Sequence, residues 1–439
     1  MIRTNIILLF AFAFLNGPIE AQKTKSNSSK PNIIFILADD LGIGNVSSYG
    51  ADNFKTPNID QLAKTGIQFK HAYTEPLCGP SRAMILTGRY AFRTGATSQL
   101  GASKLDPSKE ILIPSVLKKA GYITSAIGKW NQLPLSPADF GFDDYLKFRG
   151  SGVYWNNEKK IEQYSINGKN IQLKDDEYMA DIMHDHLVDF ISQNANKPFY
   201  IHYAMSHIHG KIQPTPDSKR GSTNLYGDNI DYMDKLVGKL ISALDSLKLR
   251  DNTLIIFMGD NGTAQGFAER ATIGGKPLSG MKGTMKEGGS LVPMIANWPA
   301  GISKERVSDI LVDASDILPT FAEIAGADLP ANTIIDGQSF ASQLTGKKGK
   351  SREWIFMELG NKWYVRDAKW KLNREGELFD MRNAPFEEKL VVDYNSDKDS
   401  RNAYNRLKEV LDKLDPASGI LDEGDGKNKK PRKKIRKRK

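Results

Sequence analysis

Apolar residues are grouped along the chain in two alternating patterns. Short continuous apolar runs are typical of strands that are buried on both faces. Such runs are expected to form strands at 33–38, 67–73, 122–129, 198–205, 252–260 and 291–298. Apolar residues at three-to-four spacing predict helices at 57–65, 177–194, 226–247 and 313–326. The alternation of these elements predicts an α/β fold, a mostly parallel sheet flanked by helices.

The pattern changes after about Gly346. Short β-like runs separated by turns, such as "REWIFMEL" and "GELFDM", are followed by the helical segment 401–414. We therefore expect a small C-terminal subdomain that combines an antiparallel sheet with one helix. The predicted organisation is a signal peptide, a polar linker, the main α/β domain, the C-terminal subdomain and a disordered basic tail. Their ranges are 1–21, 22–30, 31–346, 347–421 and 422–439.

The first 21 residues have the features of a cleaved secretory signal. Arg3 precedes an apolar stretch at 6–15, and the segment ends on the small residue Ala21. The apolar stretch is too short to span a bilayer, and no later stretch approaches the ~18 apolar residues of a membrane helix. The sequence predicts an exported protein, periplasmic or extracellular, with no transmembrane segment.

The formal net charge of +9 is concentrated in the tail. Residues 427–439 contain ten lysines and arginines and no acid, so the rest of the chain is nearly neutral. Such a tail stays solvated and attracts polyanions. It is either a solubility tail or a binding element, and no groove-reading motif indicates a specific nucleic-acid partner.

Polar residues follow two of the expected strands. Asp39 and Asp40 come directly after the first strand, and Asp260 and Asn261 end the run at 252–260. Ligands of open α/β sheets collect at the carboxyl ends of strands. These side chains offer only oxygen donors, which suit Ca²⁺ and also Mg²⁺, whereas zinc would favour histidine or cysteine. Either pair alone would be read as a turn or a helix cap.

The single cysteine of the chain, Cys78, opens a probable helix with Arg82 one turn further on. An exported protein with one cysteine has no internal disulfide. A buried packing role is the ordinary explanation for such a residue. However, a helix N-terminus stabilises anions, and Arg82 could hold an oxyanion there.

The stretch "CGPSRAMILTGR" (78–89) resembles the full signature of type I sulfatases, C-x-P-S-R-x-x-x-L-T-G-R. Further segments resemble the motifs of that family in the same order: "IIFILADDLG", "GKW" at 128–130, "SHIHG" at 206–210, "GDNG" at 259–262, "MKGTMKEGG" at 281–289 and "GELFDM". The resemblance covers most of the chain after the signal. It implies the alkaline-phosphatase-like α/β fold.

The resemblance also implies a covalent modification of Cys78. In this family a separate maturation enzyme oxidises the cysteine to Cα-formylglycine (3-oxoalanine). A serine nucleophile would end as a stable alkyl sulfate, whereas a hydrated aldehyde carries two hydroxyls on one carbon. One hydroxyl attacks sulfur, and the other then loses its proton and expels sulfate.

The family roles carry over to matching residues. Asp39, Asp40, Asp260 and Asn261 would bind one Ca²⁺, which polarises the sulfate oxygens. Arg82 would hold the formylglycine hydroxyl, and Lys129 and Lys282 would neutralise sulfate charge. His209 resembles the histidine that protonates the leaving oxygen, with His207 as the other candidate. His184 and His186 are interpreted as structural helix residues.

The chain departs from the family pattern at two positions. Asn131 stands where the family usually has a histidine that assists sulfate release, and Leu291 replaces an arginine at a structural position. Asparagine cannot exchange a proton near neutral pH. Either another group substitutes, with His71 and His207 as candidates, or turnover is slower.

These observations predict an exported, Ca²⁺-dependent sulfatase. Its substrate is expected to be a sulfated polysaccharide or oligosaccharide. The rings of Trp155, Trp363 and Trp370 either stack on the sugars or serve packing. Asn131 and the basic tail leave a weakly active or non-catalytic binder of sulfated polyanions as an alternative. A phosphoesterase of the same superfamily is disfavoured, because those enzymes usually have a histidine in place of Asn261.

Overall fold

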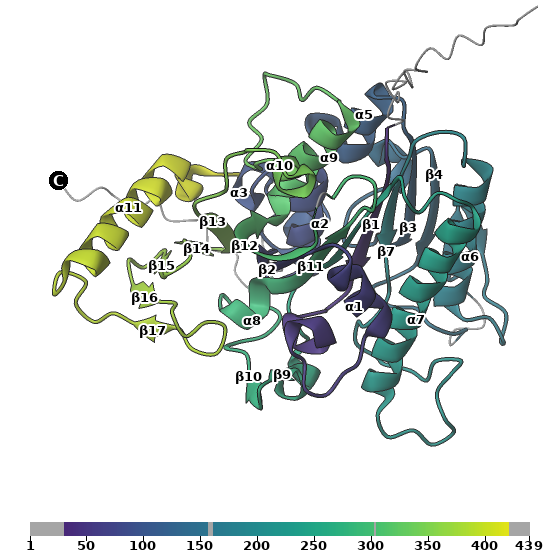
Figure 1. Ribbon diagram of the computed structural model, residues 1–439, viewed down its shortest axis with the longest axis horizontal. Coiled ribbons are helices and arrows are strands. Elements are labelled where there is room, and N and C mark those ends of the chain that lie inside the picture. Colours follow the sequence, from purple (N-terminus) through teal and green to yellow (C-terminus); the bar gives the residue numbers. More distant parts are fainter. Residues whose placement is uncertain (1–29, 157–160, 303, 421–439) are drawn as a thin grey trace, which may run out of the picture.

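A ten-stranded sheet forms the centre of the molecule in the computed structural model, which describes residues 30–156, 161–302 and 304–420 (Figure 1). The strands lie in the order β12 (Arg306–Asp313), β2 (Ile67–Tyr73), β11 (Leu291–Asn297), β8 (Thr253–Gly259), β1 (Asn32–Ala38), β7 (Phe199–Ala204), β3 (Ile123–Lys129), β4 (Asp144–Phe148), β5 (Tyr164–Ile166) and β6 (Lys169–Ile171). Within this sheet β11 and β5 run against the other strands. The predicted mostly parallel sheet is confirmed.

The central strands are the continuous apolar runs of the sequence. All residues of β1 and β8 are buried, as expected for strands covered on both faces. In the parallel register Ala38 lies opposite Gly259, and Leu37 lies opposite Ala204. β1, β7 and β8 therefore end at one edge of the sheet, and the residues that follow them are brought together there.

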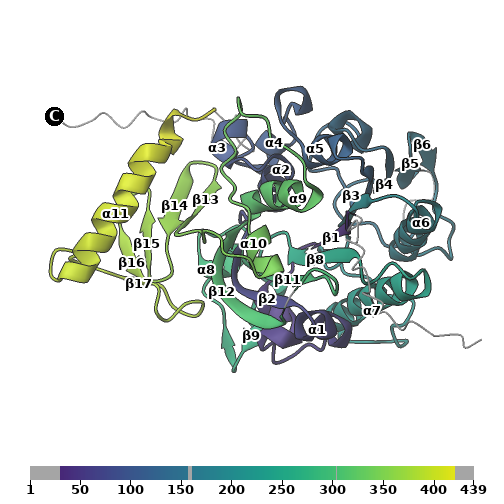
Figure 2. The same cartoon turned by 45° about the horizontal axis from the view of Figure 1, so that its top comes forward.

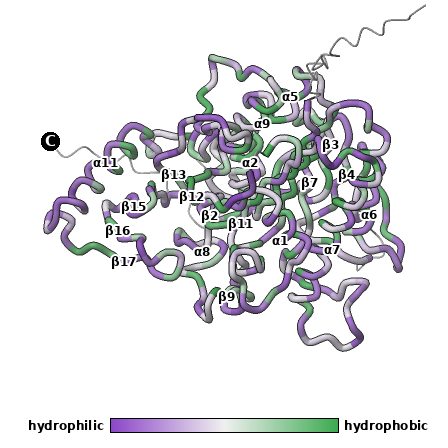
Figure 3. The backbone as a smooth tube through the Cα atoms, in the orientation of Figure 1, coloured by the Kyte–Doolittle hydropathy of each residue, from purple (hydrophilic) through white to green (hydrophobic). Residues whose placement is uncertain are grey.

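Helices cover both faces of the sheet in two layers (Figure 2). One layer contains α2 (Cys78–Thr87), α5 (Ile113–Lys119), α9 (Ile317–Ala325) and α10 (Ala341–Thr345). The other contains α1 (Pro57–Lys64), α6 (Met179–Gln193) and α7 (Leu225–Ser246). Alternate residues of β1 point into the two apolar cores, and hydrophobic residues gather along the sheet (Figure 3).

The C-terminal part forms the predicted antiparallel sheet with one helix. Its strands are β13 (Ile355–Leu359), β14 (Lys362–Arg366), β15 (Trp370–Asn373), β16 (Leu378–Asp380) and β17 (Lys389–Leu390). α11 (Lys398–Leu414) packs on this sheet through Leu407 and begins at Asp397, whose carboxylate accepts from the backbone N–H groups of Asp399 and Ser400.

Several short elements complete the fold. They are α3 (Ala91–Thr94), α4 (Gln99–Ala102), α8 (Glu287–Ser290), the hairpin strands β9 (Thr272–Ile273) and β10 (Lys276–Pro277), and 3-10 turns at Ile43–Asn45, Ser47–Tyr49, Pro107–Lys109, Pro137–Phe140, Gln265–Arg270, Ala314–Asp316 and Pro416–Ser418. The sequence pattern did not predict β4, β5, β6 or β12. β5 and β6 have three residues each, and β12 carries two exposed residues, so none of these three strands shows a continuous apolar run.

The predicted signal peptide and nearly all of the predicted linker and basic tail lie outside the described residues. Across the described ranges, the helices are either too short or too polar to cross a bilayer. The predicted boundary at residue 346 falls between α10 and β13.

Candidate active site

Charged and amide side chains converge where the parallel strands end. We call the following residues the strand-end cluster: Asp39, Asp40, Arg82, Lys129, Asp260, Asn261 and Lys282. The backbone joins the strand ends directly. Asp260 N donates to Ala38 O at 2.9 Å, and Asp39 N donates to His207 O at 2.7 Å. The turns that carry Asp39, Asp40, Asp260 and Asn261 are thus tied directly to the ladder of the sheet.

The turn after β1 has an unusual backbone conformation. Asp40 has a φ of 57°, in the left-handed region that few residues other than glycine adopt. Its N–H donates to Asp260 Oδ1 at 3.0 Å, which ties the turn to the end of β8. Non-glycine residues in this region are concentrated at functional sites, where the surrounding structure holds them.

Each carboxylate of the cluster contacts one cation. Lys129 Nζ lies 2.7 and 2.6 Å from the two carboxylate oxygens of Asp39. Arg82 contacts Asp260 Oδ2 through Nε at 3.1 Å and Nη2 at 2.8 Å. Lys282 Nζ forms an ion pair with Asp40 Oδ1. Three acids are therefore balanced by three cations, and all six residues are buried except Lys282, whose side chain is 18% exposed.

The cations keep Asp260 charged. Burial alone would raise the pKa of Asp260, but Arg82, Lys129 and Lys282 together hold that pKa below its ordinary value. Burial would lower the pKa of Lys129, and Asp39 above all reverses this and raises it. Asp260 is a carboxylate and Lys129 an ammonium ion at neutral pH.

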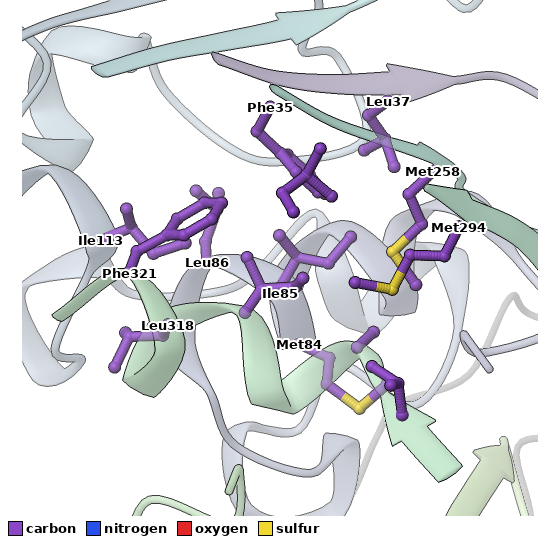
Figure 4. Packing of buried hydrophobic residues seen from close by; sticks show 14 of the residues in the cluster. Phe35, Leu37, Met84, Ile85, Leu86, Ile113, Met258, Met294, Leu318 and Phe321 are labelled. Atoms are coloured by element: carbon purple, nitrogen blue, oxygen red, sulfur yellow. The ribbon is translucent and has the colours of Figure 1, made fainter. Parts of the chain in front are cut away.

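Cys78 is the first residue of α2 and lies beside this cluster. The apolar side of α2 anchors the helix, since Met84, Ile85 and Leu86 pack into the core (Figure 4). Their neighbours there are Phe35, Leu37, Ile113, Met258, Met294, Leu318 and Phe321. Burial raises the pKa of the Cys78 thiol, and the nearby Lys129 offsets only part of this rise. The unmodified side chain is a thiol, not an activated thiolate.

The loop that carries Lys282 approaches the cluster closely. Lys282 N donates to Thr263 O at 3.0 Å, and Gly283 N donates to Pro76 O at 2.8 Å. A Cβ atom on Gly262 would lie 1.8 Å from the carbonyl oxygen of Gly288. The glycines of "GDNG" and "KEGG" are therefore needed for this approach.

The donor set fits a hard divalent cation. Asn261 Nδ2 donates to Asp40 Oδ1 at 2.9 Å, while Asn261 Oδ1 is buried and has no hydrogen-bond partner among the described residues. Asp39, Asp40 and His209 each place one possible ligand atom within 4.8 Å of the others. A buried oxygen without a donor is costly unless something fills its lone pairs. Calcium meets this requirement with the oxygen ligands present here.

The two histidines after β7 have different surroundings. His209 is half-buried, and burial first and Lys129 next lower its pKa to about 4. His207 is fully buried with its Nε2 atom 3.0 Å from the hydroxyl of Tyr178, and burial lowers its pKa to about 3. Of the two, His209 is the one that lies beside the aspartates. His207 packs among aromatic rings.

The other predicted histidines lie elsewhere. His71 is on β2, where burial first and Arg366 next lower its pKa. His184 is buried on α6, and His186 pairs with Asp144 at 2.9 Å. No contact between any of these three residues and Cys78 is recorded for the described part of the chain. Their positions agree with structural roles.

Asn131 is exposed and lines a cavity of about 240 Å³. The other lining residues are Lys147, Phe148, Arg149, Glu162, Tyr164, Ser165 and Asn170. The described residues show no contact from Asn131 to Cys78. Gln99, which sequence reasoning missed, makes that contact instead, at 3.4 Å from the sulfur. Gln99 lies on the four-residue helix α4, too short for a periodic signal. Leu291 is buried in the core, in agreement with a structural position.

Comparison with known proteins assigns the chain to a family. A family model described as Sulfatase matches residues 31–327, and one described as N-sulphoglucosamine sulphohydrolase, C-terminal, matches residues 281–416. The chain belongs to the sulfatase family. It is an enzyme of the class that hydrolyses sulfate esters, and the predicted family membership is confirmed.

Named relatives and solved structures resemble this sulfatase over most of its length. It is 31% identical to the N-acetylgalactosamine-6-O-sulfatase of Bacteroides thetaiotaomicron, with 79% of this chain and 82% of the relative covered. It is 31% identical to the N-acetylgalactosamine-6-sulfatase of the dog, Canis lupus familiaris, covering 72% and 66%. The crystal structure of Ps i-CgsB in complex with k-i-k-neocarrahexaose has a TM-score of 0.77 at 29% identity and covers 88% and 93%. The predicted alkaline-phosphatase-like architecture is confirmed.

Proposed function

We propose that this sulfatase is an exported, Ca²⁺-dependent enzyme that hydrolyses sulfate esters of a glycan through a formylglycine made from Cys78. The observation that carries the proposal is the complete sulfatase signature with its cysteine at the start of α2, beside the strand-end cluster. A raised thiol pKa argues against direct use of the sulfur as a nucleophile. It agrees with a cysteine that serves as the precursor of another group, formed by a separate maturation enzyme.

Asp39, Asp40, Asp260 and Asn261 would hold the calcium ion. The buried Asn261 Oδ1 supports this assignment, because no donor among the described residues occupies its lone pairs. When bound, Ca²⁺ would withdraw charge from the sulfate oxygens and favour ionisation of the attacking hydroxyl. Mg²⁺ is the other ion that the same oxygen set accepts.

A formylglycine hydrate would supply one hydroxyl that attacks sulfur and a second whose deprotonation releases sulfate. Three cationic residues of the chain would bind the groups that take part in this reaction. Arg82 is held rigidly by Asp260 and by Lys129 O, and its guanidinium would donate to an oxygen at position 78. Lys129 and Lys282 present ammonium groups where the sulfate charge would be bound.

His209 would give its proton to the glycan oxygen as the S–O bond to the glycan breaks. Without substrate the imidazole is neutral at pH 7, since burial and Lys129 lower its pKa to about 4. A sulfate ester carries a negative charge and would raise that pKa when it binds beside the ring. Asp40 already acts in the same direction.

The substrate is proposed to be a sulfated polysaccharide or oligosaccharide. Two relatives are named for the 6-sulfate of N-acetylgalactosamine, and Ps i-CgsB binds a neocarrahexaose. The polar cavity beside Asn131, with Lys147 and Arg149 in its lining, suits an anionic molecule rich in hydroxyls. Trp363 is buried and Trp155 donates to Pro214 O, so both tryptophans serve packing rather than an open sugar platform.

Mass spectrometry of the tryptic peptide 71–82, "HAYTEPLCGPSR", tests the proposal. Protein secreted by its native host should carry an aldehyde at position 78 and release sulfate from a panel of sulfated glycans. The mature chain should begin at Gln22 if the signal is cleaved as proposed. An unmodified thiol, from a host shown to mature another sulfatase, would favour the non-catalytic binder of sulfated polyanions.

A further inference from the structure

Gln99 contacts the reacting position of the site. Its Oε1 atom accepts from the Cys78 Sγ–H at 3.4 Å and from the backbone N–H of Gly79 at 3.3 Å. A backbone N–H can only donate, so the carboxamide oxygen, and not the NH₂ group, must face position 78. The orientation of this side chain is thus fixed by a second, independent contact.

The local sequence is built for this contact. Ser98 Oγ accepts from Gly101 N at 3.1 Å and fixes the start of α4, so that Gln99 is its first residue. A Cβ atom on Gly79 would lie 2.9 Å from Gln99 Oε1 and 3.0 Å from the Cβ atom of Ala102. Gly79 occupies the variable second position of the signature, and here only glycine leaves room for the glutamine at its present distance.

We propose that Gln99 is a catalytic residue of this sulfatase, whose carboxamide oxygen accepts a hydrogen bond from one hydroxyl of the hydrated aldehyde at position 78. The inference rests on the proposed formylglycine function. An amide oxygen holds a hydroxyl without taking its proton, because it does not titrate near neutral pH. Gln99 occupies this place in a chain where Asn131 lines the cavity with Lys147 and Arg149 and has no contact with Cys78 among the described residues.

The same contact favours the hydrate over the free aldehyde. The hydrate has hydroxyl donors for Gln99 Oε1, whereas an aldehyde carbon and oxygen offer none. Removing the acceptor should therefore shift the equilibrium toward the free aldehyde, which reacts with hydroxylamine to form an oxime. This equilibrium can be measured without sulfatase turnover.

The experiment compares full-length wild-type protein with Gln99→Ala and with the control Gln68→Ala, all matured in the same host. Gln68 is a half-buried glutamine on β2 with a hydrogen bond to Ser48 O at 3.1 Å, remote from position 78. For each protein one measures the fraction of chains converted to formylglycine by mass spectrometry, the rate of oxime formation, and kcat and KM for 4-nitrophenyl sulfate. We expect Gln99→Ala to keep the converted fraction and KM, form the oxime about 2- to 13-fold faster, and lose kcat by a similar factor, the range for one uncharged hydrogen bond.

Two further variants distinguish loss of the contact between Gln99 and position 78 from a general loss of structure. Gly79→Ala should displace Gln99 and give the same two changes, and the double variant with Gln99→Ala should add little to either. Gln99→Glu retains an acceptor oxygen, so its oxime rate should stay near the wild-type value at neutral pH while kcat gains a new dependence on pH.

The outcomes distinguish this inference from the proposed function. An aldehyde in all proteins with equal oxime rates and equal kcat in Gln99→Ala and Gln68→Ala would overturn the role of Gln99 alone. An unmodified thiol in the wild-type protein would overturn the formylglycine function and this inference together. If Gln99→Ala fails to fold, the same comparison between wild type and Gly79→Ala decides the question.

Discussion

Among the clusters of buried charged residues in the described structure, two that are built differently can be compared. The second cluster, which we call the junction cluster, joins the main sheet to the C-terminal sheet and consists of Tyr73, Glu287, Arg366, Lys371 and Glu388. Every carboxylate oxygen in it has a donor. Glu287 accepts from Arg366 Nη1 at 2.6 Å and from the Tyr73 hydroxyl at 2.9 Å. Glu388 accepts from Lys371 Nζ at 2.6 Å and from Glu287 N at 2.7 Å.

The strand-end cluster is buried except at Lys282, and it is not closed. Asn261 Oδ1 and His209 Nδ1 are buried atoms without a hydrogen-bond partner among the described residues. Asp40 adopts a left-handed backbone conformation. Native structures leave few buried polar atoms unsatisfied, and such atoms are expected where a ligand completes the network. A closed network indicates a structural role, and an open one indicates a binding site.

The largest expected effect comes from Cys78→Ala. If position 78 supplies the nucleophile, turnover of sulfate esters should fall by about 10,000-fold or more, because no other group in the cluster can attack sulfur. The fold should persist, since Cys78 is a small side chain at the start of a well-packed helix. Sulfate release by the variant, together with its Tm, checks this. Activity within tenfold of wild type would exclude a nucleophile at this position.

Removal of calcium should affect the strand-end cluster and not the junction cluster. Treatment with EGTA is expected to abolish sulfatase activity and lower the Tm, and added Ca²⁺ should restore both. An ion at 100 times its Kd contributes about 2.7 kcal/mol to the free energy of unfolding. Asp260→Asn should lose this calcium-dependent change in Tm. A full response in that variant, or no response in wild type, would show that the strand-end cluster does not hold the ion.

Arg366→Met tests the closed cluster. It should lower the free energy of unfolding by about 3–5 kcal/mol, because Glu287 would remain buried without its cation. The kcat of the folded fraction should not change, since Arg366 contacts none of the strand-end residues in the described structure. Denaturant unfolding and kcat measure the two effects. Lys408→Met, which breaks an exposed pair with Asp412 on α11, is the control and should alter stability little. If Arg366→Met lost activity while its stability stayed unchanged, the junction cluster would have a functional rather than a structural role.

The sequence predicted the open cluster better than the closed one. Asp39, Asp40, Asp260 and Asn261 directly follow strands, so the parallel register alone places them together. Arg366 and Tyr73 are 293 positions apart, and nothing in their local pattern indicates that they pair. Charged residues are ordinarily expected at the surface, which hides a buried ion pair from sequence reasoning. The sequence did not predict Gln99 as a site residue for a similar reason, because its approach to Cys78 depends on how α4 packs against α2.

Asn131→His is expected to have the smallest effect. The sequence comparison suggests that a histidine here would speed sulfate release, but the structure turns Asn131 into the cavity beside Arg149. Because Gln99 occupies the contact with position 78, kcat for 4-nitrophenyl sulfate should stay within about twofold of wild type. A larger rise would mean that an imidazole can reach the reacting group from this side, and that asparagine limits turnover. Combining Asn131→His with Gln99→Ala sharpens the result, since rescue of the lost kcat only in the double variant would show that the two side chains serve alternative routes to the same hydroxyl.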